Sequence, residues 1–143
     1  MSLHSVSWRV IVSALDQNEL IEDSLKWISG EKSDVEITKD TSYHGSQQFT
    51  IVVKNKKKKG AKRSLQRLGR DALLQLLEND IQKRVDEDKY FHVRIKLSNL
   101  VRGEIMLADN NTTTSTVKGK FKIESYPGES AVDVISSLIK ELI

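Results

Sequence analysis

The chain has 143 residues and no cysteine, so disulfide bonds, thiolate metal sites and a cysteine nucleophile are all excluded. It also lacks any apolar run near the ~18 residues that a membrane-spanning helix needs. Residues 1–8 lack the apolar segment of a signal peptide. The sequence therefore predicts a soluble, cytoplasmic protein whose residues 1–143 form one domain around one core.

Sequence motifs for catalysis are missing as well. There is no nucleophile elbow, paired-histidine zinc motif, phosphate loop or calcium loop, and the three histidines are scattered. The triplet Asp86-Glu87-Asp88 has carboxylates for a divalent ion, but its place at the end of a predicted helix favours a polar turn. We therefore predict no catalytic residue, metal site or cofactor, and nuclease activity ranks below the binding functions.

The first half of the chain predicts a strand, a helix and a hairpin. Alternating β-branched residues favour a strand over 8–15, and Asp16 with Glu19 resembles a capping box that starts a helix ending near Gly30. The apolar face predicted for that helix comprises Leu20, Ile21, Leu25 and Ile28. Two alternating strands flank the turn-rich stretch 40–48, in which Gly45 is expected at positive φ.

The second half predicts a long helix and further strands. Leu65, Leu68, Ala72 and Leu76 are spaced as one face of a helix over 61–85. The remaining predicted elements are strands over 90–97, 104–107 and 117–125 and a helix over 131–142, started by Ser130 with Asp133. The order βαββαβββα predicts an α+β domain with a mainly antiparallel sheet and helices packed on one face.

Charge is segregated along the sequence. Residues 54–70, the basic segment, contain no acidic residue and nine of the 23 basic ones, so this segment carries +9. Because the whole chain carries +3, the remainder carries −6, which indicates a polyanion partner. The basic residues of the segment are Lys54, Lys56, Lys57, Lys58, Lys59, Lys62, Arg63, Arg67 and Arg70.

Part of the basic segment falls on the predicted long helix. There Arg63, Arg67 and Arg70 share a face opposite the apolar stripe, and Lys59 and Lys62 connect it to a mobile lysine loop at 56–59. Arginine suits phosphate recognition because its planar fork binds bidentately. The alternative is an ordinary solvated helix face, although such faces usually mix charge signs.

A second basic set lies on two predicted strands. If both strands belong to one sheet, their outward residues form a basic face with interleaved aromatic rings, on which unpaired bases stack. The alternative is a half-solvated sheet. The set comprises Tyr90, His92, Arg94 and Lys96 on one strand and Lys118, Lys120 and Lys122 on the other. Within Tyr43-His44-Gly45, His44 is either a turn residue or a further RNA contact.

The order of the first six elements resembles the RNA-recognition motif, but the third strand lacks that family's glycine and paired aromatics. The chain better resembles an archaeal family of small predicted RNA-binding or exosome-associated subunits. Its fold is similar to that of the large-subunit ribosomal protein that holds 5S ribosomal RNA. The resemblance rests on residues 10–14, 43–45, 91–95, 103–105 and 122–127. The lysine run at 56–59 and Leu97-Ser98-Asn99-Leu100 depart from the family pattern.

Charge pattern and resemblance together predict a non-enzymatic RNA-binding accessory protein that docks on phosphates. The resemblance implies a role in RNA processing or degradation beside exosome subunits, with single-stranded or structured RNA as partner. The alternative is a protein–protein adaptor or a homodimer whose basic segment contacts an acidic partner. No membrane partner is expected.

Overall fold

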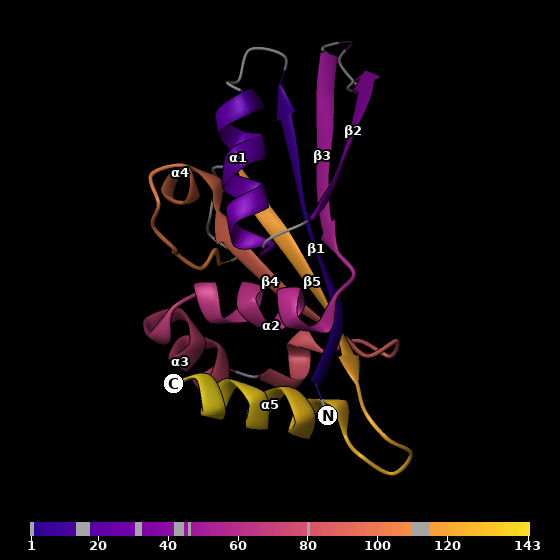
Figure 1. Ribbon diagram of the computed structural model, residues 1–143. Coiled ribbons are helices and arrows are strands. Elements are labelled where there is room, and N and C mark those ends of the chain that lie inside the picture. Colours follow the sequence, from indigo (N-terminus) through magenta and orange to yellow (C-terminus); the bar gives the residue numbers. More distant parts are fainter. Residues whose placement is uncertain are drawn as a thin grey trace.

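In the residues described by this computed structural model, five strands form one antiparallel sheet in the order β2-β3-β1-β5-β4 (Figure 1). The structure describes residues 2–13, 18–30, 33–41, 45, 47–79, 81–109 and 115–143. The strands are β1 (Ser2–Ser13), β2 (Asp34–Thr41), β3 (Gln47–Asn55), β4 (Tyr90–Lys96) and β5 (Thr116–Glu124).

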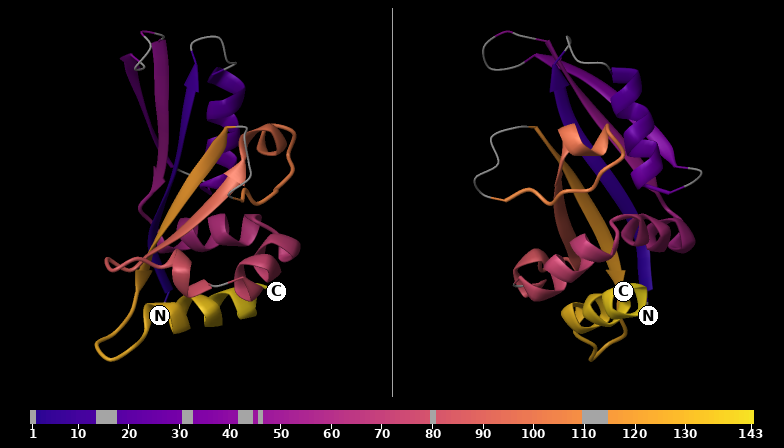
Figure 2. Two further views of the ribbon diagram at one scale, coloured as in Figure 1. Left: turned by 180° about the vertical axis from the view of Figure 1, so that it is seen from behind. Right: turned by 90° about the vertical axis from the view of Figure 1, so that its left-hand side faces the viewer.

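The helices that pack on the sheet cover the face carrying its apolar side chains, as the two views of Figure 2 show. They are α1 (Asn18–Ile28), α2 (Lys58–Arg67), α3 (Arg70–Glu78), a 3₁₀ turn η1 (Ile81–Arg84), α4 (Leu97–Leu100) and α5 (Ala131–Leu142). This arrangement confirms the predicted single α+β domain. We call the opposite, helix-free side of the sheet the open face.

Strand alternation separates the core from the open face. On β1 the side chains of Val6, Trp8 and Val10 are buried, whereas Arg9 and Ile11 between them are exposed. The pairing of β1 with β5 is shifted by a bulge between Leu3 and Ser5, which interrupts the period-two pattern. This interruption hid the first part of β1 from the alternation pattern, and the strand begins at Ser2, well before the predicted start at residue 8.

The indole of Trp8, on β1, holds α2 against the core face of the sheet. Trp8 Nε1 donates a hydrogen bond to Ser64 Oγ on α2 at 2.8 Å, and both side chains are buried. The ring lies over Gly119 of β5, where an added Cβ would sit 2.5 Å from Trp8 Cη2. Phe121 meets the indole edge-on, with 5.8 Å between ring centroids. These contacts place α2 on one side of β1 and β5, as Figure 1 shows.

A buried asparagine fixes the start of the basic segment. Asn55 Nδ2 donates to the Ser29 carbonyl at 3.1 Å, and Asn55 Oδ1 accepts from the Lys57 N–H at 3.1 Å. Only glycine fits at position 60, because a Cβ there would lie 2.0 Å from Asn55 Nδ2. The ends of α1 and β3 and the start of α2 therefore meet at one side chain.

Two predicted elements differ from the structure. The single long helix predicted over 61–85 is divided into two helices. α2 begins at Lys58 and ends at Arg67, and Gly69, with φ +87°, separates it from α3. The predicted strand over 104–107 is only a single bridge, between Leu107 and Ile95, beside β4. Leu97, predicted as the end of β4, instead begins the short helix α4.

Most other local predictions are confirmed. β2 and β3 form the expected hairpin, Gly45 has φ +84°, and Gly30 ends α1 with φ +89°. Ser130 caps α5 by accepting from the Asp133 N–H at 3.4 Å. Leu20, predicted to face the core, is 44% exposed. Asp16 of the predicted capping box lies outside the described residues. In the part of the chain described, no helix is long and apolar enough to span a membrane.

Replacing Gly119 with alanine should destabilise the fold, because the new methyl group would overlap the buried Trp8 ring. We expect the free energy of unfolding to fall by about 1–3 kcal/mol, measured by urea denaturation. Lys39→Ala, at an exposed position of the edge strand β2, is the control and should change stability by less than about 0.5 kcal/mol. Equal stability of the Gly119 variant and wild type would contradict the packing described.

Candidate nucleic-acid interface

The open face carries a continuous set of basic side chains on four neighbouring strands. Register and alternation place them on the side away from the helices. They are Arg9 on β1, Lys54 on β3, Lys118, Lys120 and Lys122 on β5, and Arg94 and Lys96 on β4. The two strands predicted to share a basic face are therefore adjacent, with Arg94 opposite Lys118 and His92 opposite Lys120.

A hollow of about 390 Å³ on the open face joins this set to the basic segment. Ser7 pairs in register with Lys54 on one side and with Lys120 on the other, so its small side chain lies between two lysines. We call this feature the sheet hollow; its lining residues are His4, Ser5, Val6, Ser7, Lys54, Asn55, Lys56, Tyr90 and Lys120. The two basic regions predicted separately meet here.

Tyr90 is the aromatic ring of the sheet hollow and lies among cations. Lys120 Nζ is 4.1 Å and Lys122 Nζ 4.5 Å from the centroid of the Tyr90 ring. Lys122 Nζ also donates to the Asp88 carbonyl at 2.6 Å, which orients that lysine. The hollow therefore combines positive charge with a partly exposed ring.

The triplet Asp86-Glu87-Asp88 forms a hydrogen-bonded turn beside the open face. Asp86 Oδ1 accepts from the Asp88 and Tyr90 N–H groups, both at 2.9 Å, and Asp86 Oδ2 lies 2.7 Å from His92 Nε2. Desolvation opposes the charge on Asp86, but these hydrogen bonds hold the pKa of its carboxyl below the ordinary value. Among the described residues, no three histidine or acidic side chains are placed to hold a metal ion.

The lysines at 56–59, predicted to form a mobile loop, lie partly on a helix. Lys57 precedes α2, and Lys58 and Lys59 lie in its first turn. Lys58 Nζ lies 2.8 Å from Glu124 Oε1 on β5. The hydrogen bond between them raises the pKa of the Lys58 ammonium and lowers that of the Glu124 carboxyl. Lys56, Lys57, Lys59 and Lys62 are exposed.

The predicted stripe of Arg63, Arg67 and Arg70 is not one surface. Arg70 belongs to α3, beyond the break at Gly69. Arg67 packs on α1, with its guanidinium carbon 5.3 Å from the centroid of the Trp27 ring and its Nη1 donating to the Trp27 carbonyl. Arg67 is thus a contact between helices, while Arg63 and Arg70 are exposed. His44 lies outside the described residues.

Two arginines near the site were missed from the sequence. Arg9 lies opposite Lys118 on the open face, and its alternation with Trp8 and Val10 on a predicted strand was a usable signal. Arg84 lies in η1 next to β4. Burial, followed by repulsion from Arg94, lowers the pKa of Arg84. No sequence signal identified Arg84, because η1 was predicted as the last turn of a long helix.

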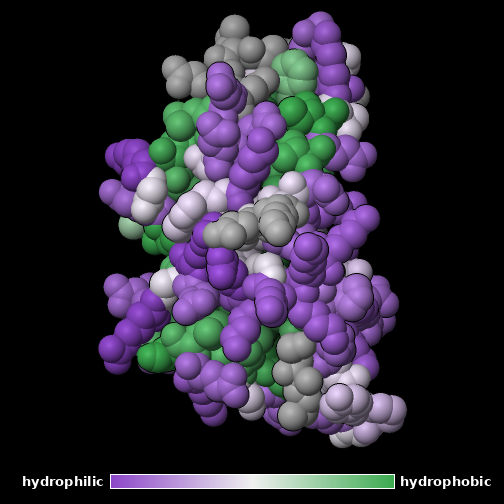
Figure 3. All heavy atoms as spheres, in the orientation of Figure 1, coloured by the Kyte–Doolittle hydropathy of each residue, from purple (hydrophilic) through white to green (hydrophobic). Residues whose placement is uncertain are grey.

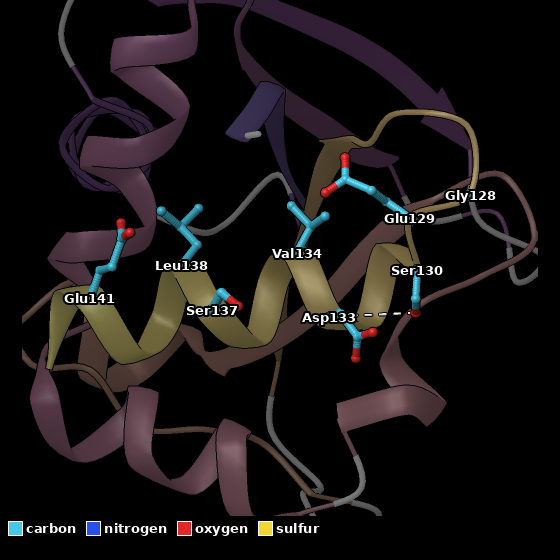
Figure 4. A pocket seen from close by; sticks show the side chains of 8 residues that line it. All are labelled: Gly128, Glu129, Ser130, Asp133, Val134, Ser137, Leu138 and Glu141. Carbon is cyan, nitrogen blue, oxygen red and sulfur yellow. Dashed lines mark hydrogen bonds between the residues drawn. The ribbon is translucent and has the colours of Figure 1, made fainter.

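A second hollow, of about 340 Å³, lies along α5 and has the opposite character (Figure 4). Glu129, Asp133 and Glu141 supply its charges, and Val134 and Leu138 supply apolar surface. Such a lining repels a polyanion. Seen from the helix side, most of the surface is hydrophilic, with apolar side chains gathered beside α1 and again between α2 and α5 (Figure 3).

Comparison with known proteins supports the same class of function. The sequence model of a family described as "RNA binding" matches residues 5–123. The chain belongs to this RNA-binding family. No curated protein sequence matches the chain. Family membership agrees with the RNA partner predicted from the charge pattern and with the RNA-binding part of the predicted resemblance.

Solved structures of archaeal proteins share the fold of this family member. A DUF54 protein from Archaeglobus fulgidus is 18% identical, with a TM-score of 0.75, and the match covers 99% of this chain and 100% of that one. A DUF54 protein from Methanothermobacter thermautotrophicus is 14% identical, with a TM-score of 0.72 and coverage of 99% and 98%. A UPF0201 protein from Methanococcus jannaschii is 12% identical, with a TM-score of 0.59 and coverage of 94% and 92%.

Arg67→Gln should lower the stability of the protein, because it removes the cation–π contact and the hydrogen bond that join α2 to α1. We expect a loss of about 1 kcal/mol in the free energy of unfolding, measured by urea denaturation. Arg70→Gln, an exposed arginine in the neighbouring helix, is the matched control and should stay within about 0.5 kcal/mol of wild type. Equal effects of the two changes would argue against a structural role for Arg67.

Proposed function

We propose that this protein is a non-enzymatic RNA-binding accessory protein that holds the sugar–phosphate backbone against the open face and the adjoining lysines of the basic segment. The sheet hollow carries the proposal, since Lys54, Lys56 and Lys120 surround a small-residue floor beside Tyr90. Lysines that neutralise phosphates release counterions, which supplies sequence-independent affinity. The partly exposed Tyr90 ring offers an unpaired base a stacking surface beside these lysines.

The family match supports RNA as the partner class. On the resemblance described above, we further propose a cytoplasmic role in RNA processing or degradation beside exosome subunits. The remaining predicted contacts, including His44, Lys96 and Lys122, belong to the same proposal. Arg67 contributes by holding α2 in place.

The alternative is a protein–protein adaptor. Its support is a set of exposed apolar side chains on α1 and on the edge strand β2, where Leu20 is 44%, Trp27 43% and Ile37 49% exposed. An acidic partner would contact the basic segment in that case. The two functions differ in their response to RNA and in which surface changes matter.

RNA affinity should fall steeply with salt, and the sheet hollow should account for part of that dependence. Changing Lys54, Lys56 and Lys120 together to Gln should flatten the slope of log affinity against log salt by about 2, at ~0.7 per phosphate contact of a single strand. Fluorescence anisotropy with labelled RNA measures the slope. All sequences should weaken alike, because phosphate contacts do not read bases.

The matched control for this experiment changes Lys26, Lys39 and Lys140 to Gln, which removes the same charge from other surfaces. It should keep the wild-type slope to within about 0.7, the contribution of one phosphate contact. A second comparison changes Lys62, Arg63 and Arg70. If only that variant loses affinity, RNA binds along the helices instead. Wild-type protein that ignores RNA but binds an acidic protein would support the adaptor.

The protein should leave RNA intact in the presence of Mg²⁺ or Mn²⁺. Two-metal cleavage needs carboxylates that hold ions close together, and the Asp86 carboxylate is engaged with His92 and backbone N–H groups instead. Gel analysis of end-labelled RNA measures the outcome. Cleavage that disappears in Asp86→Asn would establish a nuclease.

A further inference from the structure

Three cations lie side by side across the open face. Arg9 on β1 pairs in register with Lys118 on β5, and Lys118 pairs with Arg94 on β4. Directly opposed side chains on antiparallel strands have Cβ atoms about 4.5–5.5 Å apart. The three residues, which we call the cationic row, therefore form a line perpendicular to the strands.

Among the described residues, no acidic side chain forms an ion pair with Arg9, Lys118 or Arg94. On the far side of Arg9 its register partner is the apolar Val52, and Glu36 follows only on the next strand, β2. Arg94 Nε is buried without a hydrogen-bond partner in the described part of the protein. The bridge between Val85 and Phe91 holds η1 against β4 three residues along the strand from Arg94, and Arg84 lies close enough to Arg94 for their charges to repel. Like charges opposed in this way destabilise a sheet.

The surface beside the row is hollowed. β1 and β5 pair no further than Arg9 and Lys118, and beyond them a notch of about 260 Å³ opens. Its lining includes Arg9, Ile11, Thr116 and Lys118. The row is therefore reachable by a ligand from the open face.

We propose that the cationic row, continued by Arg84, is a second phosphate-binding line that takes the backbone of single-stranded RNA across β1, β5 and β4. This inference rests on the proposed RNA-binding function and adds the path of the strand and two residues, Arg9 and Arg84. The line lies two residues along the strands from Ser7, Lys120 and His92, which is about 7 Å at the usual rise per residue. One RNA strand can thus engage the row and the sheet hollow together. To do so it must turn between the two, which flexible single-stranded RNA can do and a stiff A-form duplex cannot.

The test compares Arg9→Gln/Lys118→Gln with the matched control Lys39→Gln/Lys140→Gln. Arg9 and Lys118 are exposed, so the fold should persist. With a labelled oligouridine of about 12 nucleotides, inside the range of about 4–16 nucleotides that one OB fold binds, the row variant should lose about 1.4 from the salt slope. Between 50 and 200 mM salt, wild-type affinity should then fall roughly sevenfold more than that of the variant. The control should match wild type.

Two further outcomes separate this inference from the proposed function. If wild type binds no RNA, the proposed function itself fails. If the sheet-hollow variant loses affinity while the row variant matches its control, only the second line is wrong. A matched duplex RNA should bind more weakly than the single strand, and preference for the duplex would overturn the single-stranded path.

Thermal stability gives a readout independent of RNA. Lys118→Gln removes the central charge of the row, so at low salt the Tm should rise by roughly 1–3 °C. The gain should vanish in 1 M salt, where the charges are screened. An unchanged Tm at low salt would contradict the repulsion on which the inference rests.

Discussion

The contact between Trp8, Gly119 and Ser64 determines which face of the sheet is covered by helices and which stays open. The indole occupies the space that only glycine leaves free on β5, and its N–H is satisfied by a hydroxyl of α2. A buried indole N–H without a partner would be costly, so the helix must stay on that side of β1. With the helices committed to one face, the other face is left to solvent and to a ligand.

Positive charges on the open face and at the start of α2 lie where they lower the stability of the local structure. Lysines follow one another at the start of α2, where the helix dipole disfavours positive charge; Glu124 on β5 offsets Lys58, but the turn itself contains no acidic residue beside Lys57 and Lys59. On the sheet, Lys118 faces an arginine on each side. Places where a sequence breaks local rules without internal compensation are where a function is expected. A polyanion would relieve both conflicts.

Apolar periodicity predicted most of the fold, because one-sided packing leaves a strong trace in the sequence. The alternation of Phe91, Val93 and Ile95 predicted β4, and the run 131–142 predicted α5. The predictions failed where a single backbone feature interrupts the period. A bulge hid the start of β1, and Gly69 divided a stripe whose apolar spacing continues across the break.

The candidate site was predicted only in part. Charge counting found the basic segment, and alternation found the outward residues of β4 and β5. Neither could show that Lys54 and Lys120 flank the same serine, because β1 joins strands that are distant in sequence. Charge counting also grouped Arg67 with its neighbours, although its guanidinium lies on Trp27. Which cations are available to a ligand depends on tertiary contacts.

The central claim is that RNA lies on the open face, and arginine side-chain NMR tests it most directly. The Nε–H signals of Arg9 and Arg94 should shift together on addition of a short single-stranded RNA. The signal of Arg102 should not move, since its Nε donates to the Ser98 carbonyl of α4, a helix packed on the core side of the sheet. Shifts at Arg63 and Arg70 with none at Arg9 and Arg94 would contradict the account.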